Sequence, residues 1–108
     1  MPERGGSQPQ GENLIEDSEV RRIRKEVDVL DSELIGLLAK RRDLAIQMGK
    51  IKRRKHLPIV DGKRNEEVLE RVIGEAKKYG LDEKKVEEFW KCIIKCAIEE
   101  QERLDFVD

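Results

Sequence analysis

Two long cationic side chains, Arg41 and Lys52, stand on an apolar stripe of the sequence. In LLAKRRDLAIQMGKIK, residues 37–52, apolar residues recur at spacings of three, four and seven, which is typical of one face of an α-helix. Position 41 continues that stripe and is an arginine. Arg41 and Lys52 are eleven residues apart, about three helical turns, so both side chains leave the same face with Cβ atoms ~16 Å apart.

Polar residues also stand on the inward faces predicted for two later helices. Gln101 continues an apolar stripe one turn after Ala97, and Asn65 begins the apolar face of a helix beside Arg64. A buried amide needs hydrogen-bond partners, and buried like charges are costly without a counter-charge. No Asp or Glu lies on the stripe of Arg41. An anionic ligand would supply the missing charge. Each residue alone also has a structural explanation, since an arginine stem can cover apolar surface and a glutamine can mark a helix end.

The periodicity predicts an all-α fold of three helices, one of them very long. Residues 1–13, rich in glycine and proline, are predicted to be a disordered tail, and residues 14–108 a single helical domain. Asp17 or Ser18 begins a helix that no proline interrupts before Pro58. Helices over about 63–78 and 83–104 follow. Gly80 separates them, and Asp82 is expected to cap the second of the two. No strand pattern is present.

The lengths of these helices predict a homodimer. The first would be about 57 Å long, against about 24 Å and 33 Å for the others, which leaves much of its apolar seam uncovered. A second copy crossing or running beside it would cover the seam. Arg24 lies seventeen residues before Arg41, rotated by about 100°, so it could share the pocket of Arg41 only from a partner chain.

The composition favours a small-molecule ligand over a polymer or a membrane. The 23 Lys and Arg residues nearly balance the 24 Asp and Glu residues, so nothing attracts nucleic acid overall. The basic run KIKRRK, residues 50–55, suits the C-terminal end of a helix, where cations oppose the macrodipole. No apolar run reaches the ~18 residues of a membrane span and no signal peptide is evident, which predicts a cytoplasmic protein. No cofactor and no metal ion are predicted.

From Val20 to Leu104 the sequence resembles the all-helical (AroQ-type) chorismate mutases. The matching stretches are IRKEVDVLDSELIGLLAKRRDLAIQMGKIK, LPIVDGKRNEEVLERV and FWKCIIKCAIEEQERL. The order R-x6-D-x9-R-x10-K, followed by a Pro-Ile-x-Asp turn and a late Gln, is specific to that family and its near relatives. The resemblance implies an intertwined dimer of three-helix chains, with two active sites that both chains form.

The resemblance also implies a role for each polar residue. Arg24 would reach into the partner's site, Arg41 would bind a carboxylate in its own chain, and Lys52 would contact a carboxylate and the ether oxygen. Gln101 would donate to the ether oxygen from the far side. The substrate-binding residues that it implies are Arg24, Arg41, Lys52, Asp61, Arg64, Asn65 and Gln101, with Lys52, Gln101 and Arg41 as the catalytic ones.

Two positions depart from the family. Asn65 stands where many relatives have a glutamate that holds the ring hydroxyl, and Ala97 stands where some have a serine.

The implied reaction is the [3,3] rearrangement of chorismate to prephenate, in phenylalanine and tyrosine biosynthesis, with no proton transfer and no nucleophile. The alternatives are an isochorismate-pyruvate lyase of the same fold and a non-enzymatic dimeric helical interaction module.

Overall fold

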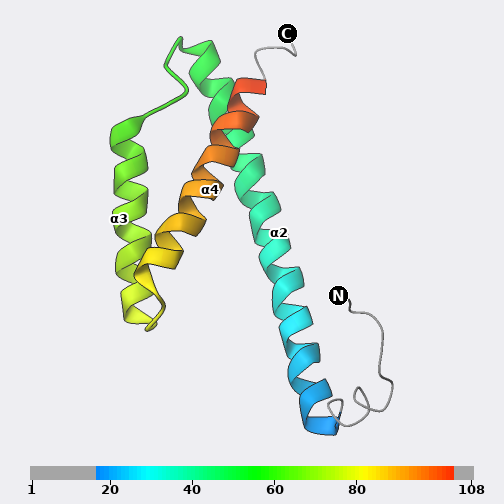
Figure 1. Ribbon diagram of the computed structural model, residues 1–108. Helices are drawn as coiled ribbons and strands as arrows, with labels where there is room; N and C mark the ends of the chain where they lie inside the picture. The colour runs from blue at the N-terminus through cyan, green and yellow to red at the C-terminus, as the bar shows by residue number, and fades with distance from the viewer. Residues whose placement is uncertain (1–16, 104–108) are drawn as a thin grey trace, which may run out of the picture. The chain divides into compact units, whose positions relative to one another are not determined.

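The computed structural model describes residues 17–103 and consists of three α-helices, which confirms the all-α prediction. They are α2 (Ser18–Arg54), α3 (Gly62–Lys78) and α4 (Glu83–Arg103), coloured along the chain in Figure 1. No strand occurs within residues 17–103. The tail expected over 1–13 and the last expected helical residue, Leu104, lie outside the described residues.

The contacts of the chain fall into two units, Met1–Ala39 and Lys40–Asp108, with the division inside α2. Each unit is therefore described by itself. The prediction of a single domain over 14–108 stays a prediction.

In the first unit, α2 begins at the predicted cap. The Asp17 Oδ1 atom accepts a hydrogen bond of 2.8 Å from the backbone N–H of Val20, which satisfies a donor that the first helical turn leaves free. Long apolar side chains of this segment are largely exposed in the single chain: Ile23, Val27, Val29, Leu30, Leu34, Ile35, Leu37 and Leu38.

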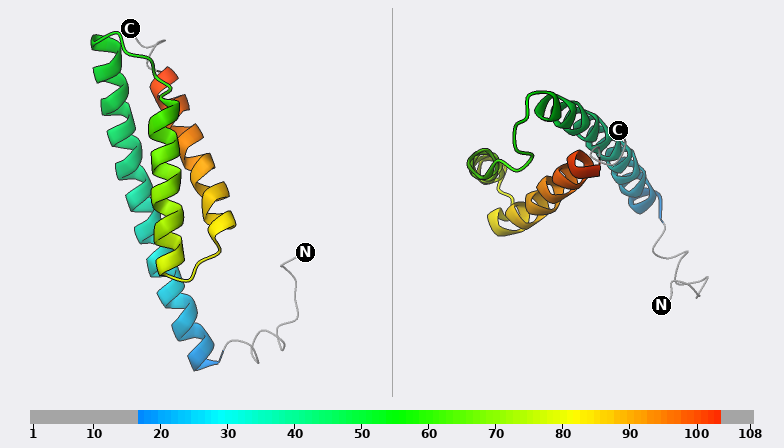
Figure 2. Two further views of the ribbon diagram at one scale, coloured as in Figure 1. Left: turned by 90° about the vertical axis from the view of Figure 1, so that its left-hand side faces the viewer. Right: turned by 90° about the horizontal axis from the view of Figure 1, so that it is seen from above.

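In the second unit, α3 and α4 are in contact and diverge at an angle from the short turn that joins them, as Figure 1 and the right-hand view of Figure 2 show. Val68, Val72 and Ala76, spaced four residues apart on α3, are buried, as is Ala45 of α2. The side chains on this face are small or β-branched, so the helices can approach closely. The buried face of α3 is therefore the one that carries Asn65 at its N-terminal end.

The C-terminal end of α3 has a Schellman motif centred on Gly80. The N–H of Leu81 donates to the carbonyl of Ala76 at 2.9 Å, and the N–H of Gly80 donates to the carbonyl of Lys77 at 3.2 Å. Gly80 has a φ of 70°, which glycine adopts without steric cost. Asp82 then caps α4 by accepting from the N–H of Lys85 at 3.1 Å.

The C-terminal end of α2 has the same motif, but with a histidine at its centre. The N–H of Leu57 donates to the carbonyl of Lys52 at 2.8 Å, and the N–H of His56 donates to the carbonyl of Arg53 at 3.1 Å. His56 has a φ of 56° and is the one residue other than glycine with positive φ in the part of the chain that the structure describes. Pro58 follows and ends the helical pattern.

Candidate ligand-binding site

All three helices of the second unit contribute to one cavity of about 720 Å³. Its apolar walls come from Leu44, Ala45 and Met48 of α2, Val68 of α3, and Ile94, Ala97 and Ile98 of α4, with Ile59 from the connecting loop. This volume lies within the range of small-molecule sites. The polar lining residues are Arg41, Lys52, Asp61, Lys63, Arg64, Asn65, Glu67, Arg71 and Gln101.

The charge of the cavity lining is predominantly positive. Five of the polar lining residues are cationic and two are acidic. Both acidic groups have other partners: Asp61 caps α3, accepting from the N–H of Arg64 at 3.1 Å, and Glu67 lies 3.7 Å from the Arg64 guanidinium. The cavity therefore suits an anionic ligand with an apolar body.

Arg41 is paired with neither of these carboxylates. It is half-buried, and within residues 17–103 it makes no ion pair and no hydrogen bond through its side chain. Burial, followed by repulsion from Arg71 and then Arg64, lowers the pKa of Arg41 from its usual value. Because an arginine remains charged at ordinary pH, the effect is an uncompensated cation that a carboxylate would stabilise.

Lys52 is held by two acceptors. Its Nζ atom donates to the backbone carbonyl of Ile59 at 2.6 Å and to the Oε1 atom of Gln101 at 3.3 Å. An ammonium group has three N–H donors, and the third has no partner among the described residues. Lys52 therefore has one donor that is available to a ligand while two others fix its position.

Gln101 is the one buried polar residue of the described chain, with 8% of its surface exposed. Its Oε1 atom accepts from Lys52, so its NH₂ group is directed to the other side of the amide, where it can donate to a ligand. The family resemblance implied that Lys52 and Gln101 act from opposite sides of the ligand. In the structure these two side chains are in direct contact, and a ligand oxygen could accept from the third N–H of Lys52 and from the NH₂ group of Gln101 while their mutual hydrogen bond is kept.

The structure brings six of the predicted residues to this cavity: Arg41, Lys52, Asp61, Arg64, Asn65 and Gln101. They come from α2, the loop before α3, α3 and α4. Arg24 belongs to the other unit and is not among the lining residues. Proximity does not test a role in binding or catalysis, so these assignments stay predictions.

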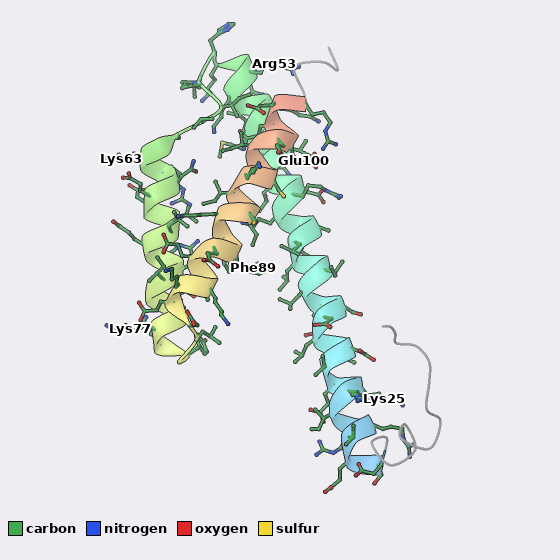
Figure 3. All side chains as sticks on the ribbon, in the orientation of Figure 1. Lys25, Arg53, Lys63, Lys77, Phe89 and Glu100 are labelled. Atoms are coloured by element: carbon green, nitrogen blue, oxygen red, sulfur yellow. The ribbon has the colours of Figure 1, made fainter. Side chains whose placement is uncertain are left out.

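Three charged lining residues were not predicted from the sequence: Lys63, Glu67 and Arg71. Figure 3 labels Lys63 at the start of α3. Arg71 is seven residues after Arg64, which is about two turns, so it lies on the same side of α3. The seven-residue spacing from Arg64 is the one signal in the sequence that could have identified it. Its guanidinium also pairs with Glu75 at 3.2 Å.

The lining residues offer electrostatic groups and few nucleophiles. No Ser, Thr, Cys, His or Tyr lines the cavity among residues 17–103. The same part of the chain has no group of three His, Cys, Asp or Glu side chains that could hold a metal ion. None of its helices has the length and apolar character needed to cross a membrane. The described groups are suited to bind an anion, fix its conformation and donate hydrogen bonds to it.

Comparison with known proteins places most of the chain in a family. Residues 23–102 match the family described as chorismate mutase type II. The chain is 35% identical over 82 residues to the bifunctional chorismate mutase/prephenate dehydratase of Escherichia coli, a match that covers 76% of this chain and 21% of that protein. The chain thus spans about a fifth of the length of this relative.

Two further relatives are of similar size to this chain. A 4-amino-4-deoxychorismate mutase of Streptomyces venezuelae is 30% identical over 81% of this chain and 86% of its own length. A solved structure of a conserved hypothetical protein from Pyrococcus furiosus superposes with a TM-score of 0.64 at 36% identity, covering 79% of this chain and 97% of that one. The family match covers α3, most of α2 and α4, and every lining residue of the cavity, and the chain belongs to the chorismate mutase type II family.

Proposed function

We propose that the cavity binds chorismate and converts it to prephenate. One observation carries the proposal: in a chain of this family, Arg41 faces the cavity as a half-buried cation without a counter-anion, beside a Lys52–Gln101 pair with donors to spare. Chorismate carries two carboxylates on an apolar ring, which matches cations set in apolar walls.

The reaction needs the kinds of group that line this cavity. In the [3,3] rearrangement one C–O bond breaks while one C–C bond forms, with no proton transfer and no covalent intermediate. The substrate must be held in a compact, chair-like conformation that it seldom adopts in water. Negative charge grows on the ether oxygen in the transition state, so a fixed donor there lowers the barrier.

Each predicted residue has a place in this proposal. Arg41 binds a carboxylate, for which its planar guanidinium is suited. Lys52 donates its third N–H to the ether oxygen, and Gln101 donates its NH₂ group to the same atom. Asp61 supports the start of α3 as its cap, and Arg64 faces the substrate from the first turn of that helix.

We further propose that the working protein is a homodimer in which Arg24 completes the partner's site. The support is the exposed apolar side chains of Ile23 to Leu38, which in a soluble single chain would leave a long strip in water. A two-fold dimer would cover the same strip on both copies. Sedimentation equilibrium at micromolar concentration should give twice the chain mass, and a folded monomer would contradict the dimer.

Asn65 bears on the choice of substrate. It lines the cavity and is half-buried, and its amide can both donate and accept hydrogen bonds without a charge. A neutral amide can recognise a ring hydroxyl or a ring amine. The relative named 4-amino-4-deoxychorismate mutase therefore makes 4-amino-4-deoxychorismate a second candidate substrate.

The test is an assay of the full chain with product identification. Chorismate, 4-amino-4-deoxychorismate and isochorismate are supplied in turn, and products are separated and identified by mass. Formation of prephenate from chorismate supports the proposal. Salicylate and pyruvate from isochorismate would instead identify a lyase, and no consumption of any of them would favour an interaction module.

Mixing two inactive variants tests the role of Arg24. Arg24→Ala and Arg41→Ala chains are co-refolded so that chains exchange, and heterodimers are verified by native mass spectrometry. One site of each heterodimer then keeps both arginines, so a fully exchanged mixture should recover about a quarter of the wild-type activity. Verified heterodimers as inactive as either parent would show that Arg24 does not act in the opposite site.

A further inference from the structure

The loop that joins α2 to α3, residues 55–61, is bonded to both ends of Lys52. The backbone carbonyl of Lys52 accepts from the N–H of Leu57 at 2.8 Å. At the other end of the residue, Nζ donates to the carbonyl of Ile59 at 2.6 Å. The main chain and the ammonium group of one cavity lysine are therefore both attached to a segment of a few residues.

The path of this loop depends on His56. Its left-handed backbone reverses the chain after the last turn of α2, so that residues 57–59 run back beside Lys52. Few side chains occupy this region readily: glycine does so freely, asparagine and histidine less so, and β-branched residues are outliers there. The residue at position 56 thus decides how firmly the loop keeps this path.

The contact with Ile59 matters because a lysine side chain is flexible. Its four-carbon stem has many rotamers, and a free ammonium would occupy several positions in a cavity of this size. The carbonyl of Ile59 and the amide of Gln101 together select one position and leave one donor for a ligand. A donor already in place has no reorganisation to undergo when charge develops.

We propose that His56 is a positioning residue for Lys52. Its left-handed conformation places the Ile59 carbonyl where it holds the Lys52 ammonium beside Gln101. The kinetic part of this proposal rests on the proposed function, whereas the hydrogen bond from Lys52 to Ile59 can be tested without activity.

The other Schellman motif offers a matched control. Gly80 occupies, after the end of α3, the position that His56 occupies after the end of α2, with a φ of 70° against 56°. A Cβ atom at Gly80 would meet nothing within 4 Å, so a substitution there strains the backbone without a clash. Gly80 does not line the cavity. The same replacement residue at the two positions therefore adopts a comparable strained left-handed backbone, once near Lys52 and once away from it.

The experiment compares a graded series at position 56 with the same changes at position 80. His56→Gly and His56→Asn should keep kcat within about twofold, because both residues tolerate positive φ. His56→Ala should lower kcat moderately and His56→Val about tenfold, with little change in KM. Gly80→Ala and Gly80→Val should lower the melting temperature and leave kcat unchanged. His56→Ala is the milder variant if His56→Val does not fold.

Two further measurements separate positioning from general damage. In a Lys52→Ala background, His56→Val should lower the residual kcat no further, because the residue through which it acts is absent. The ¹⁵Nζ ammonium resonance of Lys52, assigned by its loss in Lys52→Ala, should be sharp in the wild type and in Gly80→Val, and exchange-broadened in His56→Val.

The proposal is overturned if His56→Val and Gly80→Val reduce kcat equally, or if the effects of His56→Val and Lys52→Ala add in full. It is also overturned if the ammonium resonance of Lys52 is broad in the wild type. If the wild type converts none of the substrates, the proposed function fails, and the resonance then decides the positioning role by itself.

Discussion

Both halves of α2 carry an apolar stripe, but they differ in the exposure of that stripe and in charge. In residues 18–39 the long apolar side chains are exposed, and Ile35 reaches 66% exposure. In residues 40–54 Ala45 and Gly49 are buried, and Arg41 and Lys52 line a cavity. One half has apolar surface without a partner, and the other has cations without an anion. The contrast suggests that the first half serves assembly and the second binds the ligand.

The largest expected effect is on assembly. If the proposed dimer covers Leu34, Leu34→Asp should raise the dimer dissociation constant about 10³-fold, because each copy would lose the burial of a leucine worth about 2 kcal/mol and the two-fold axis would double the loss. Analytical ultracentrifugation over a concentration series measures this. Ser32→Asp places the same carboxylate on the polar side of the helix and should leave the dimer intact. Unchanged association of Leu34→Asp would remove the first half of α2 from the interface.

The second effect is on catalysis by the other half of α2. Lys52→Ala should lower kcat about 10²- to 10³-fold, as loss of a donor to developing negative charge does in comparable sites. Steady-state kinetics with chorismate measures it, and near-wild-type turnover would refute the mechanism. If Lys52 only repelled the other cations of the cavity, its removal would not lower the melting temperature. The bonds of Lys52 to Ile59 and Gln101 change this expectation, so the melting temperature should fall slightly.

Gln101→Ala should reduce kcat less than Lys52→Ala, by about tenfold, because a neutral donor forms a weaker hydrogen bond with developing negative charge. The same kinetic assay compares the two variants. Gln101→Glu tests the same role more directly. When ionised, the new carboxylate would compete with the substrate for the cavity's cations and could not donate a hydrogen bond. The activity of this variant should recover as the pH falls and the carboxylate becomes protonated. A larger kcat loss in Gln101→Ala than in Lys52→Ala would reverse the assignment of the principal donor.

Arg71→Gln should raise KM about three- to tenfold with little change in kcat, because the guanidinium adds attraction for an anion without contacting the reacting atoms. The effect should shrink at high ionic strength. Arg22→Gln is the control: Arg22 also forms an exposed i,i+4 pair, with Glu26 at 2.8 Å, but does not line the cavity. Equal KM changes in the two variants would exclude a role for Arg71 in binding.

The smallest expected effect is on stability in the absence of ligand. Arg41→Met keeps the apolar stem and removes a cation that has no partner and is repelled by Arg71 and Arg64. The melting temperature should therefore hold or rise by up to about 4 °C, while affinity for the substrate falls. Thermal unfolding followed by circular dichroism measures the first effect. A clear fall in melting temperature would show that Arg41 has a structural partner.

Much of the fold could be predicted because its signals are local. Apolar spacing and capping residues placed the helices to within about two residues, and Asp17, Asp82 and Gly80 act as expected. The inward polar positions were also readable, since Arg41 and Gln101 each continue an apolar stripe and Asn65 begins one. The left-handed conformation of His56 was not, because a left-handed residue other than glycine has no reliable pattern in sequence.

The sequence by itself determined three helices, their polar interruptions and an unusual pair of cations on one face, since these depend on the period of the α-helix. Only the tertiary structure decided which of these groups meet. Lys52 contacts Gln101 from 49 residues away and a backbone carbonyl of Ile59, which no side-chain pattern identifies. Arg71 likewise lines the cavity only because of how α3 packs in the tertiary structure. The physical cause is that contacts between helices depend on how the helices pack, which local periodicity does not specify.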